Sequence, residues 1–270
     1  MSISGNEVNV AVPHMRIELG AKKRNFERVR RVAQVAKEMG AQILLLPSMF
    51  NVGPADNPLF RVRVSRKRIV ESGAEQTASL LREISSSLGI VIVAGPIYER
   101  VGSKTYRTVL LVEPLRGVVV RARKLVTEEG SSPISDAVID MGMSFGILAE
   151  DDTMLPELSL YMILRGVDAI LAFPSLGPEG MKQRLALMTR AMECRCTTLV
   201  VGGIVCRSGE DLYEVPTTVI NEEGGIDEEV KGMHERVLVV SLRKSSCKRV
   251  VDSKRIRLIK SLRKLVSGFR

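Results

Sequence analysis

The stretch FGILAEDDTMLPE (145–157) has the pattern of a buried strand that runs into a sharp turn and then a helix. An apolar run at 145–149 forms the strand, and Pro156 suits the first turn of the helix, where its missing N–H costs nothing. Three consecutive acids at 150–152 stand between strand and helix. In an open α/β sheet, ligands and reacting groups gather at the carboxyl ends of strands. We therefore predict that this turn carries a site.

Short apolar runs alternate with longer amphipathic runs on both sides of this stretch. Strands are predicted at 8–13, 43–48, 90–96, 108–113, 117–122, 143–150, 169–175, 198–205 and 236–242. Helices are predicted at 22–39, 75–88, 156–165 and 181–195. This order indicates an α/β chain with a mixed sheet or two stacked sheets. Because no linker-like stretch interrupts it, we predict one domain over 1–252.

The composition predicts a globular protein with a sizeable core, since 45% of the 270 residues are hydrophobic and 26% are charged. The sequence shows neither a leader peptide nor an apolar run long enough to span a bilayer, so we expect a cytoplasmic protein with reduced thiols. The absence of Trp fits a thermophilic source.

The basic charge is concentrated at the C-terminal end of the chain. The net charge is +9, and residues 243–270 hold eleven Lys/Arg against one acid. Apolar residues recur at helical spacing within 253–270, which predicts a basic amphipathic helix. Such a helix can bind nucleic acid, an anionic membrane or an acidic partner. It can also pack on the domain or on a dimer partner, which is the interpretation we favour.

Several motifs occur in an order that resembles the carbon–nitrogen hydrolase (nitrilase) superfamily over nearly the full chain. They are LLLPSMF (44–50), GIVIVAGPIYER (89–100), GVVVRARKL (117–125), the stretch quoted above, GVDAILAFPS (166–175) and MTRAMECR (188–195). The resemblance implies a four-layer α-β-β-α sandwich, in which two mixed β-sheets are flanked by helices. It also implies a homodimer formed through those helices.

The resemblance further implies a Glu–Lys–Cys catalytic triad, of which only the lysine is present. Lys124 matches the family lysine, whereas Ser48 stands at the glutamate position and Glu150 at the cysteine position. In the family a thiolate attacks the amide or nitrile carbon, the glutamate moves the proton and the lysine stabilises the oxyanion. What is missing at the strand end is therefore the nucleophile.

Glu150 and Ser48 are poor replacements for the missing groups. Attack by a carboxylate would have to expel an amine and leave an anhydride, and a serine hydroxyl is too weak a base. A buried lysine needs a counterion, so we predict that Glu150 neutralises Lys124. The sequence thus favours a pseudoenzyme that binds a small molecule or a partner and needs no cofactor. The alternatives are a hydrolase with a rearranged site and a polyanion-binding protein that acts through its tail.

Further residues are expected to lie around this pocket. The resemblance implies a second pocket glutamate, at Glu128 or Glu129. Asp152 is expected to support the loop, and Asp151 is expected to be an ordinary surface residue. The motif match also makes two residues after a predicted strand candidate pocket residues: Pro174 and Ser175.

Two other chemistries are conceivable in the same region. Clustered carboxylates suit a divalent cation, but a lysine among them argues against one, so we expect no metal. A displaced cysteine nucleophile would have to come from Cys194, Cys196 or Cys206, although free cysteines are more often buried hydrophobes.

Overall fold

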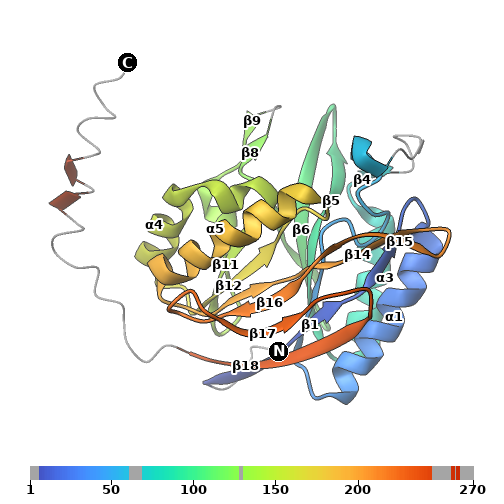
Figure 1. The fold of residues 1–270 in the computed structure, drawn as a ribbon, viewed down its shortest axis with the longest axis horizontal. Coiled ribbons are helices and arrows are strands. Elements are labelled where there is room, and N and C mark those ends of the chain that lie inside the picture. Colours follow the sequence, from blue (N-terminus) through green and yellow to red (C-terminus); the bar gives the residue numbers. More distant parts are fainter. Residues whose placement is uncertain (1–5, 61–68, 128–129, 245–256, 259, 262–270) are drawn as a thin grey trace.

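The computed structural model describes residues 6–60, 69–127, 130–244, 257–258 and 260–261. Two β-sheets stack face to face between two layers of helices (Figure 1). The helices on one side are α1 (Lys22–Glu38) and α3 (Glu75–Leu88), and those on the other are α4 (Pro156–Arg165) and α5 (Pro178–Cys194). This arrangement confirms the predicted four-layer sandwich.

The first sheet has seven strands, with parallel pairing at its centre and antiparallel pairing at both edges. Its central strands β1, β3 and β5 are parallel, whereas β18 and β6 join them antiparallel. The order is β18 (Arg236–Arg243), β1 (Glu7–His14), β3 (Ile43–Leu46), β5 (Val91–Val101), β6 (Lys104–Glu113) and β7 (Gly117–Arg123), with β4 (Glu71–Ser72) also paired to β5.

The second sheet has six strands and the same mixed character. Its parallel strands are β11, β12 and β13, and its other pairs are antiparallel. The order is β10 (Val138–Asp140), β11 (Ser144–Ala149), β12 (Ala169–Phe173), β13 (Thr198–Val200), β16 (Thr217–Ile220) and β17 (Ile226–Val230).

Smaller elements complete the described part of the chain. A three-stranded sheet contains β15 (Glu210–Val215), β14 (Gly203–Arg207) and β2 (Arg16–Glu18), and β8 (Val126–Thr127) pairs with β9 (Gly130–Ser131). Three short 3₁₀ turns are η1 (Pro58–Phe60), η2 (Ile134–Ala137) and η3 (Glu150–Met154).

Alternation along the strands divides the apolar residues among three hydrophobic cores. In β3, Ile43 and Leu45 lie between the two sheets, whereas Leu44 and Leu46 lie under α1 and α3. A third core separates the second sheet from α4 and α5. Because both faces of the central strands are buried, their sequences read as continuous apolar runs.

The prediction of one continuous strand over 198–205 is wrong. It is divided into β13 and β14, which belong to different sheets. Gly202 lies at the break, and a Cβ there would come within 2.0 Å of the Val215 carbonyl oxygen. At Gly202 the backbone passes so close to the end of β15 that no side chain would fit. The chain leaves the second sheet at this glycine.

The last two predicted helices, at 181–195 and 253–270, compare differently with the structure. The last predicted helix begins earlier than 181, because Pro178 starts α5. Of the predicted helix at 253–270, only 257–258 and 260–261 are described, and they are helical. The remainder lies outside the described residues, so the role of this segment stays a prediction. Within the described part of the chain, no helix is both long and apolar enough to cross a membrane.

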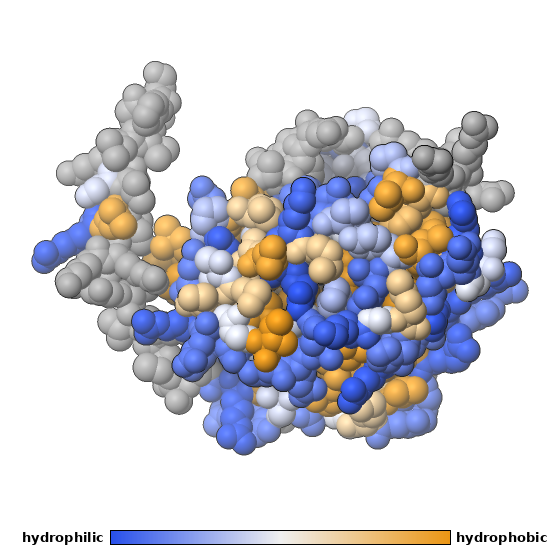
Figure 2. Space-filling model, in the orientation of Figure 1, coloured by the Kyte–Doolittle hydropathy of each residue, from blue (hydrophilic) through white to orange (hydrophobic). Residues whose placement is uncertain are grey.

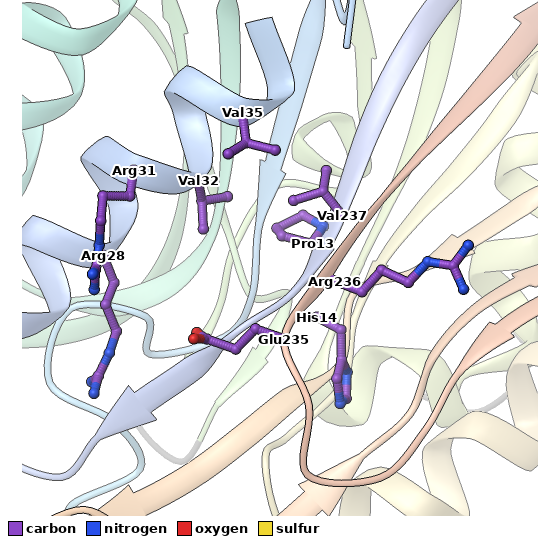
Figure 3. A pocket seen from close by; sticks show the side chains of 9 residues that line it. All are labelled: Pro13, His14, Arg28, Arg31, Val32, Val35, Glu235, Arg236 and Val237. Atoms are coloured by element: carbon purple, nitrogen blue, oxygen red, sulfur yellow. The ribbon is translucent and has the colours of Figure 1, made fainter. Parts of the chain in front are cut away.

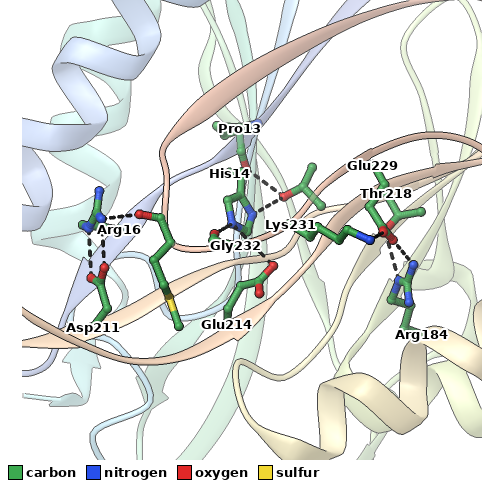
Figure 4. Close-up of polar contacts among 12 residues, drawn as sticks. Pro13, His14, Arg16, Arg184, Asp211, Glu214, Thr218, Glu229, Lys231 and Gly232 are labelled. Carbon is green, nitrogen blue, oxygen red and sulfur yellow. Dashed lines mark hydrogen bonds and ion pairs between the residues drawn. The ribbon is translucent and has the colours of Figure 1, made fainter.

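One buried histidine ties the two sheets to a loop (Figure 4). The His14 ring, at the end of β1, is fully buried, with Nδ1 3.2 Å from Thr217 Oγ1 in β16 and Nε2 3.1 Å from the Gly232 carbonyl. Burial lowers the pKa of His14, although the Gly232 carbonyl and then Glu214 oppose the shift. The folded protein therefore holds this ring neutral.

His14 should make the fold sensitive to acid. A folded-state pKa below the unfolded value means that the unfolded chain binds the proton more readily. Stability present above pH 6.5 is therefore lost as the pH falls below it, at up to about 1.4 kcal/mol per pH unit. Urea unfolding between pH 7.5 and 5.5 measures this slope. His14→Gln should reduce the slope, and the control His234→Gln, at an exposed position, should keep it. Equal slopes in both variants would show that His14 does not cause the effect.

Candidate functional site

The turn after β11 places Glu150 inside the protein. Glu150 is 3% exposed and its backbone has a φ of 52°, a left-handed conformation that few residues other than glycine adopt. Ser48, just after β3, is 1% exposed, and its hydroxyl donates to the Phe173 carbonyl at 3.0 Å. The Ser48 hydroxyl therefore serves to join the end of β3 to the end of β12.

Glu150 pairs with an arginine that sequence reasoning missed. Arg107 Nη1, from β6, lies 2.5 Å from Glu150 Oε1. The ion pair of Glu150 is thus with Arg107, whereas the ion pair of Lys124 is with Asp151, so the predicted neutralisation of Lys124 by Glu150 can act only through the charge of the nearby lysine. Burial raises the pKa of Glu150, and Arg107 and then Lys124 oppose that shift. Lys124 thus contributes to the charge balance without forming the ion pair.

Arg107 is itself held from two further sides. Its guanidinium stacks over the Tyr98 ring at 4.4 Å from the ring centroid, and its Nη2 lies 3.4 Å from Asp56 Oδ2. The Tyr98 hydroxyl donates to the same carboxylate oxygen. Burial opposes the charge on Arg107, but Glu150 and the neighbouring groups raise its pKa above the ordinary value. The guanidinium is thus fixed in place and stays charged.

Lys124 pairs with Asp151, which the sequence had suggested was an ordinary surface residue. Lys124 Nζ lies 2.9 Å from Asp151 Oδ2, and the two side chains are 12% and 67% exposed. Burial alone would raise the pKa of Asp151, but the hydrogen bond and charge of Lys124 hold it below the ordinary value. The lysine therefore neutralises the exposed acid beside Glu150.

A glutamine on α5 connects this pair to the end of β12. Gln183 Nε2 donates to Asp151 Oδ1 at 2.9 Å, and its Oε1 accepts from the Ser175 N–H at 2.7 Å. Ser175 is half-buried and the preceding Pro174 is buried. The candidate pocket residue Ser175 is thus joined to the Lys124–Asp151 pair through Gln183.

Asp152 connects the η3 turn to the segment that carries Lys124. Its Oδ2 accepts from the Leu125 N–H at 2.9 Å, and the Lys124 N–H donates to the Arg107 carbonyl at 2.8 Å. These bonds hold the three elements of the site together. The other two candidates, Glu128 and Glu129, lie outside the described residues.

The cysteines lie elsewhere in the fold. Cys194 ends α5, about 16 Å along the helix from Gln183, and Cys196 follows it. Cys206 is in β14, and burial raises its pKa. These three cysteines are buried, and the fourth, Cys247, lies outside the described residues.

The site residues missed from the sequence are Asp56, Tyr98, Arg107 and Gln183. They share no spacing with Glu150 or Lys124, because they come from a loop, from neighbouring strands and from a helix. One signal was available for Arg107, since this charged residue directly precedes the buried run of β6. The sequence does not say which carboxylate it meets there.

Comparison with known proteins adds a family and a fold. A family model described as carbon-nitrogen hydrolase matches residues 9–250. A protein named nitrilase from Pyrococcus abyssi is 27% identical over 172 residues, which cover 60% of this chain and 63% of that relative. The chloroplastic omega-amidase of Arabidopsis thaliana is 35% identical over 89 residues, or 32% of this chain and 23% of that relative. The match thus spans less than two thirds of the length of either relative.

Solved structures share the whole architecture. A double mutant of the amidase from Nesterenkonia sp. AN1 in complex with acrylamide superposes with a TM-score of 0.72 at 20% identity, covering 96% of this chain and 99% of that one. Another structure of an amidase from Nesterenkonia sp. gives a TM-score of 0.71 at 21% identity, covering 96% and 98%. At such identities the likeness concerns the fold.

The two ion pairs of the site should differ in their effect on stability. Arg107→Gln leaves the Glu150 carboxylate buried without its partner and should lower the free energy of unfolding by roughly 3 kcal/mol. Asp151→Asn breaks a pair with one exposed member and should cost less than about 1 kcal/mol. Urea unfolding of both variants measures the difference. Adding Glu150→Gln to Arg107→Gln should restore part of the loss. Similar small effects for both variants would show that Arg107 and Glu150 do not form a buried pair.

Proposed function

The chain belongs to the carbon–nitrogen hydrolase family, and from that premise we propose that it is a pseudoenzyme that binds a small molecule or a partner. The observation that supports this most directly is the state of Glu150. At the position where the family has its cysteine, this chain has a buried carboxylate held by Arg107 at 2.5 Å. An ion-paired carboxylate has little tendency to act as a nucleophile.

The other two triad positions support the same proposal. The Ser48 hydroxyl donates a hydrogen bond to the Phe173 carbonyl. It is too weak a base to accept the proton of a nucleophile. Lys124 remains, but its ammonium is engaged by Asp151 at 2.9 Å. The family reaction needs an activated thiolate, a base and a free cation at the developing oxyanion. In this chain Glu150 and Lys124 are held in ion pairs and Ser48 in a hydrogen bond, so none of the three is left to act on a substrate.

The site still presents polar groups to solvent. Arg107 is 28% exposed, Asp56 40% and Asp151 67%. A polar ligand could therefore exchange hydrogen bonds with these side chains without reaching Glu150. This supports binding at the strand ends as the retained function, whereas a hydrolase with a rearranged site would need a nucleophile among the same residues.

The proposal also includes a homodimer formed through α5. Met181, Leu185, Met188 and Met192 follow helical spacing and form one apolar stripe along this helix. Leu185 is 65% exposed and Met192 54%, which is unusual for large apolar residues on one face. Figure 2 shows apolar patches in the hydrophilic surface on the side where α4 and α5 lie. A second copy of the chain would cover this stripe.

The purified protein should not hydrolyse aliphatic amides, nitriles or carbamoyl amino acids, because the base and the nucleophile are absent. Ammonia release over a buffer blank measures this, with Lys124→Ala as the control. Turnover that disappears in Lys124→Ala would mean that the chain is an enzyme with a rearranged site. A Ser48→Glu/Glu150→Cys variant, which restores both family groups, tests whether the remaining scaffold still supports the chemistry.

The dimer should depend on the apolar stripe of α5. Leu185→Glu and Met192→Glu together place two charges in the buried interface and should yield monomers in analytical ultracentrifugation. Met39→Glu, at an exposed apolar residue at the end of α1, is the matched control and should leave the dimer intact. A monomeric native chain, or a dimer unaffected by the double change, would refute this interface.

A further inference from the structure

A cavity of about 230 Å³ lies between α1 and the edge of the first sheet, apart from the strand-end site. Its apolar walls come from Val32 and Val35 of α1, from Val237 of β18 and from Pro13 of β1. Figure 3 shows the two α1 valines directed toward Pro13 and Val237. Val35 is 41% exposed, so this apolar surface is open to solvent.

One end of the cavity is cationic. Arg28 and Arg31 stand one helical turn apart on α1, and Val32 and Val35 follow them on the same face. The two arginine side chains extend to the same side of the cavity (Figure 3). The helix therefore presents two guanidinium groups and then a hydrocarbon surface, as a ligand with an anionic head and an apolar body would require.

The charges around this end leave one cation in excess. Arg16 pairs with Asp211 at 2.8 Å and lies 3.8 Å from Glu235. Arg24 and Arg28 both contact Glu18, at 2.7 and 3.7 Å. Arg31, which is also exposed, takes part in none of these pairs. Among the described residues, Arg31 has no ion-pair partner.

The remaining polar groups of the lining do not point to a neutral polar ligand. The His14 ring nitrogens are occupied by Thr217 and the Gly232 carbonyl. Glu235 accepts the Arg16 N–H at 2.8 Å, and in Figure 3 Arg236 points away from the other lining residues. Arg28 already donates to Asn25 Oδ1 at 3.4 Å and lies 3.7 Å from Glu18, so the Arg31 guanidinium is the donor left for a ligand.

We propose that this cavity is a second binding site, which takes a small carboxylic acid with a hydrocarbon body. The carboxylate would accept hydrogen bonds from Arg31, with Arg28 beside it, because guanidinium groups match carboxylate geometry. The body would cover Val32, Val35, Pro13 and Val237 and remove their apolar surface from water. Inorganic anions would use only the cationic end, neutral alcohols only the apolar walls, and amines would be repelled.

Methyl NMR of the full chain tests the proposal directly, since its valines line the cavity. Octanoate, at concentrations where it forms no micelles, should shift the methyl signals of Val32, Val35 and Val237 saturably. Octanol should bind about tenfold more weakly, and octylamine and inorganic phosphate should leave these signals unchanged. Equal binding of octanol and octanoate would overturn the proposal, as would the same shifts with phosphate or none with octanoate.

Matched arginine variants separate this site from general surface charge. Arg31→Gln should weaken octanoate binding about tenfold, because it removes the unpaired guanidinium. Arg30→Gln is the control, since the neighbouring Arg30 is exposed and pairs with Glu83 on α3. Both positions are on the surface of α1, so both variants should fold. Equal affinity in the two variants would show that Arg31 does not hold the carboxylate.

Discussion

The buried ion pair between Arg107 and Glu150 is the interaction on which the arrangement of the strand-end site depends. Glu150 ends β11 in the second sheet, and Arg107 belongs to β6 in the first, so the pair spans the interface between the sheets. A carboxylate that is 3% exposed would be costly without a cation. Because Arg107 supplies that cation, Lys124 is available to Asp151, which in turn binds Gln183 of α5. The two ion pairs and the glutamine thus connect three layers of the sandwich.

In the pseudoenzyme that we propose, the scaffold of a hydrolase family would have exchanged reactivity for charge balance. The family chemistry requires groups whose charges are incompletely neutralised, so that a thiolate, a base and a cation can each act on a substrate. In this chain each corresponding residue has a partner: Phe173 for Ser48, Asp151 for Lys124 and Arg107 for Glu150. On the proposed correspondence of position 150 to the family cysteine, a glutamate there does more than remove a nucleophile. It also introduces a charge that the surrounding side chains have to neutralise.

The apolar runs predicted the central strands well because both faces of these strands are buried, whereas the four-layer sandwich was implied by the resemblance to the family. The prediction from apolar runs failed at Gly202, where a close backbone approach divides one apolar run between two sheets. For the site, motif positions located Ser48, Lys124 and Glu150, but not their contacts. Charge balance alone suggested Lys124 as the partner of Glu150. In the structure the ion-pair partner of Glu150 is Arg107 of β6. The local sequence of β6 does not indicate that the Arg107 side chain faces the end of β11.

The two sites of this molecule differ in how their charges are satisfied. At the strand ends Arg107 and Lys124 both have carboxylate partners, so an incoming anion would have to displace Glu150 or Asp151. Beside α1, Arg16, Arg24 and Arg28 have carboxylate partners and Arg31 has none among the described residues, and the apolar walls next to Arg31 are open to solvent. An anion that binds there displaces no internal partner of Arg31. Binding energy from both charge and apolar contact is therefore available beside α1 at little cost to the fold, whereas at the strand ends the fold itself already uses that energy.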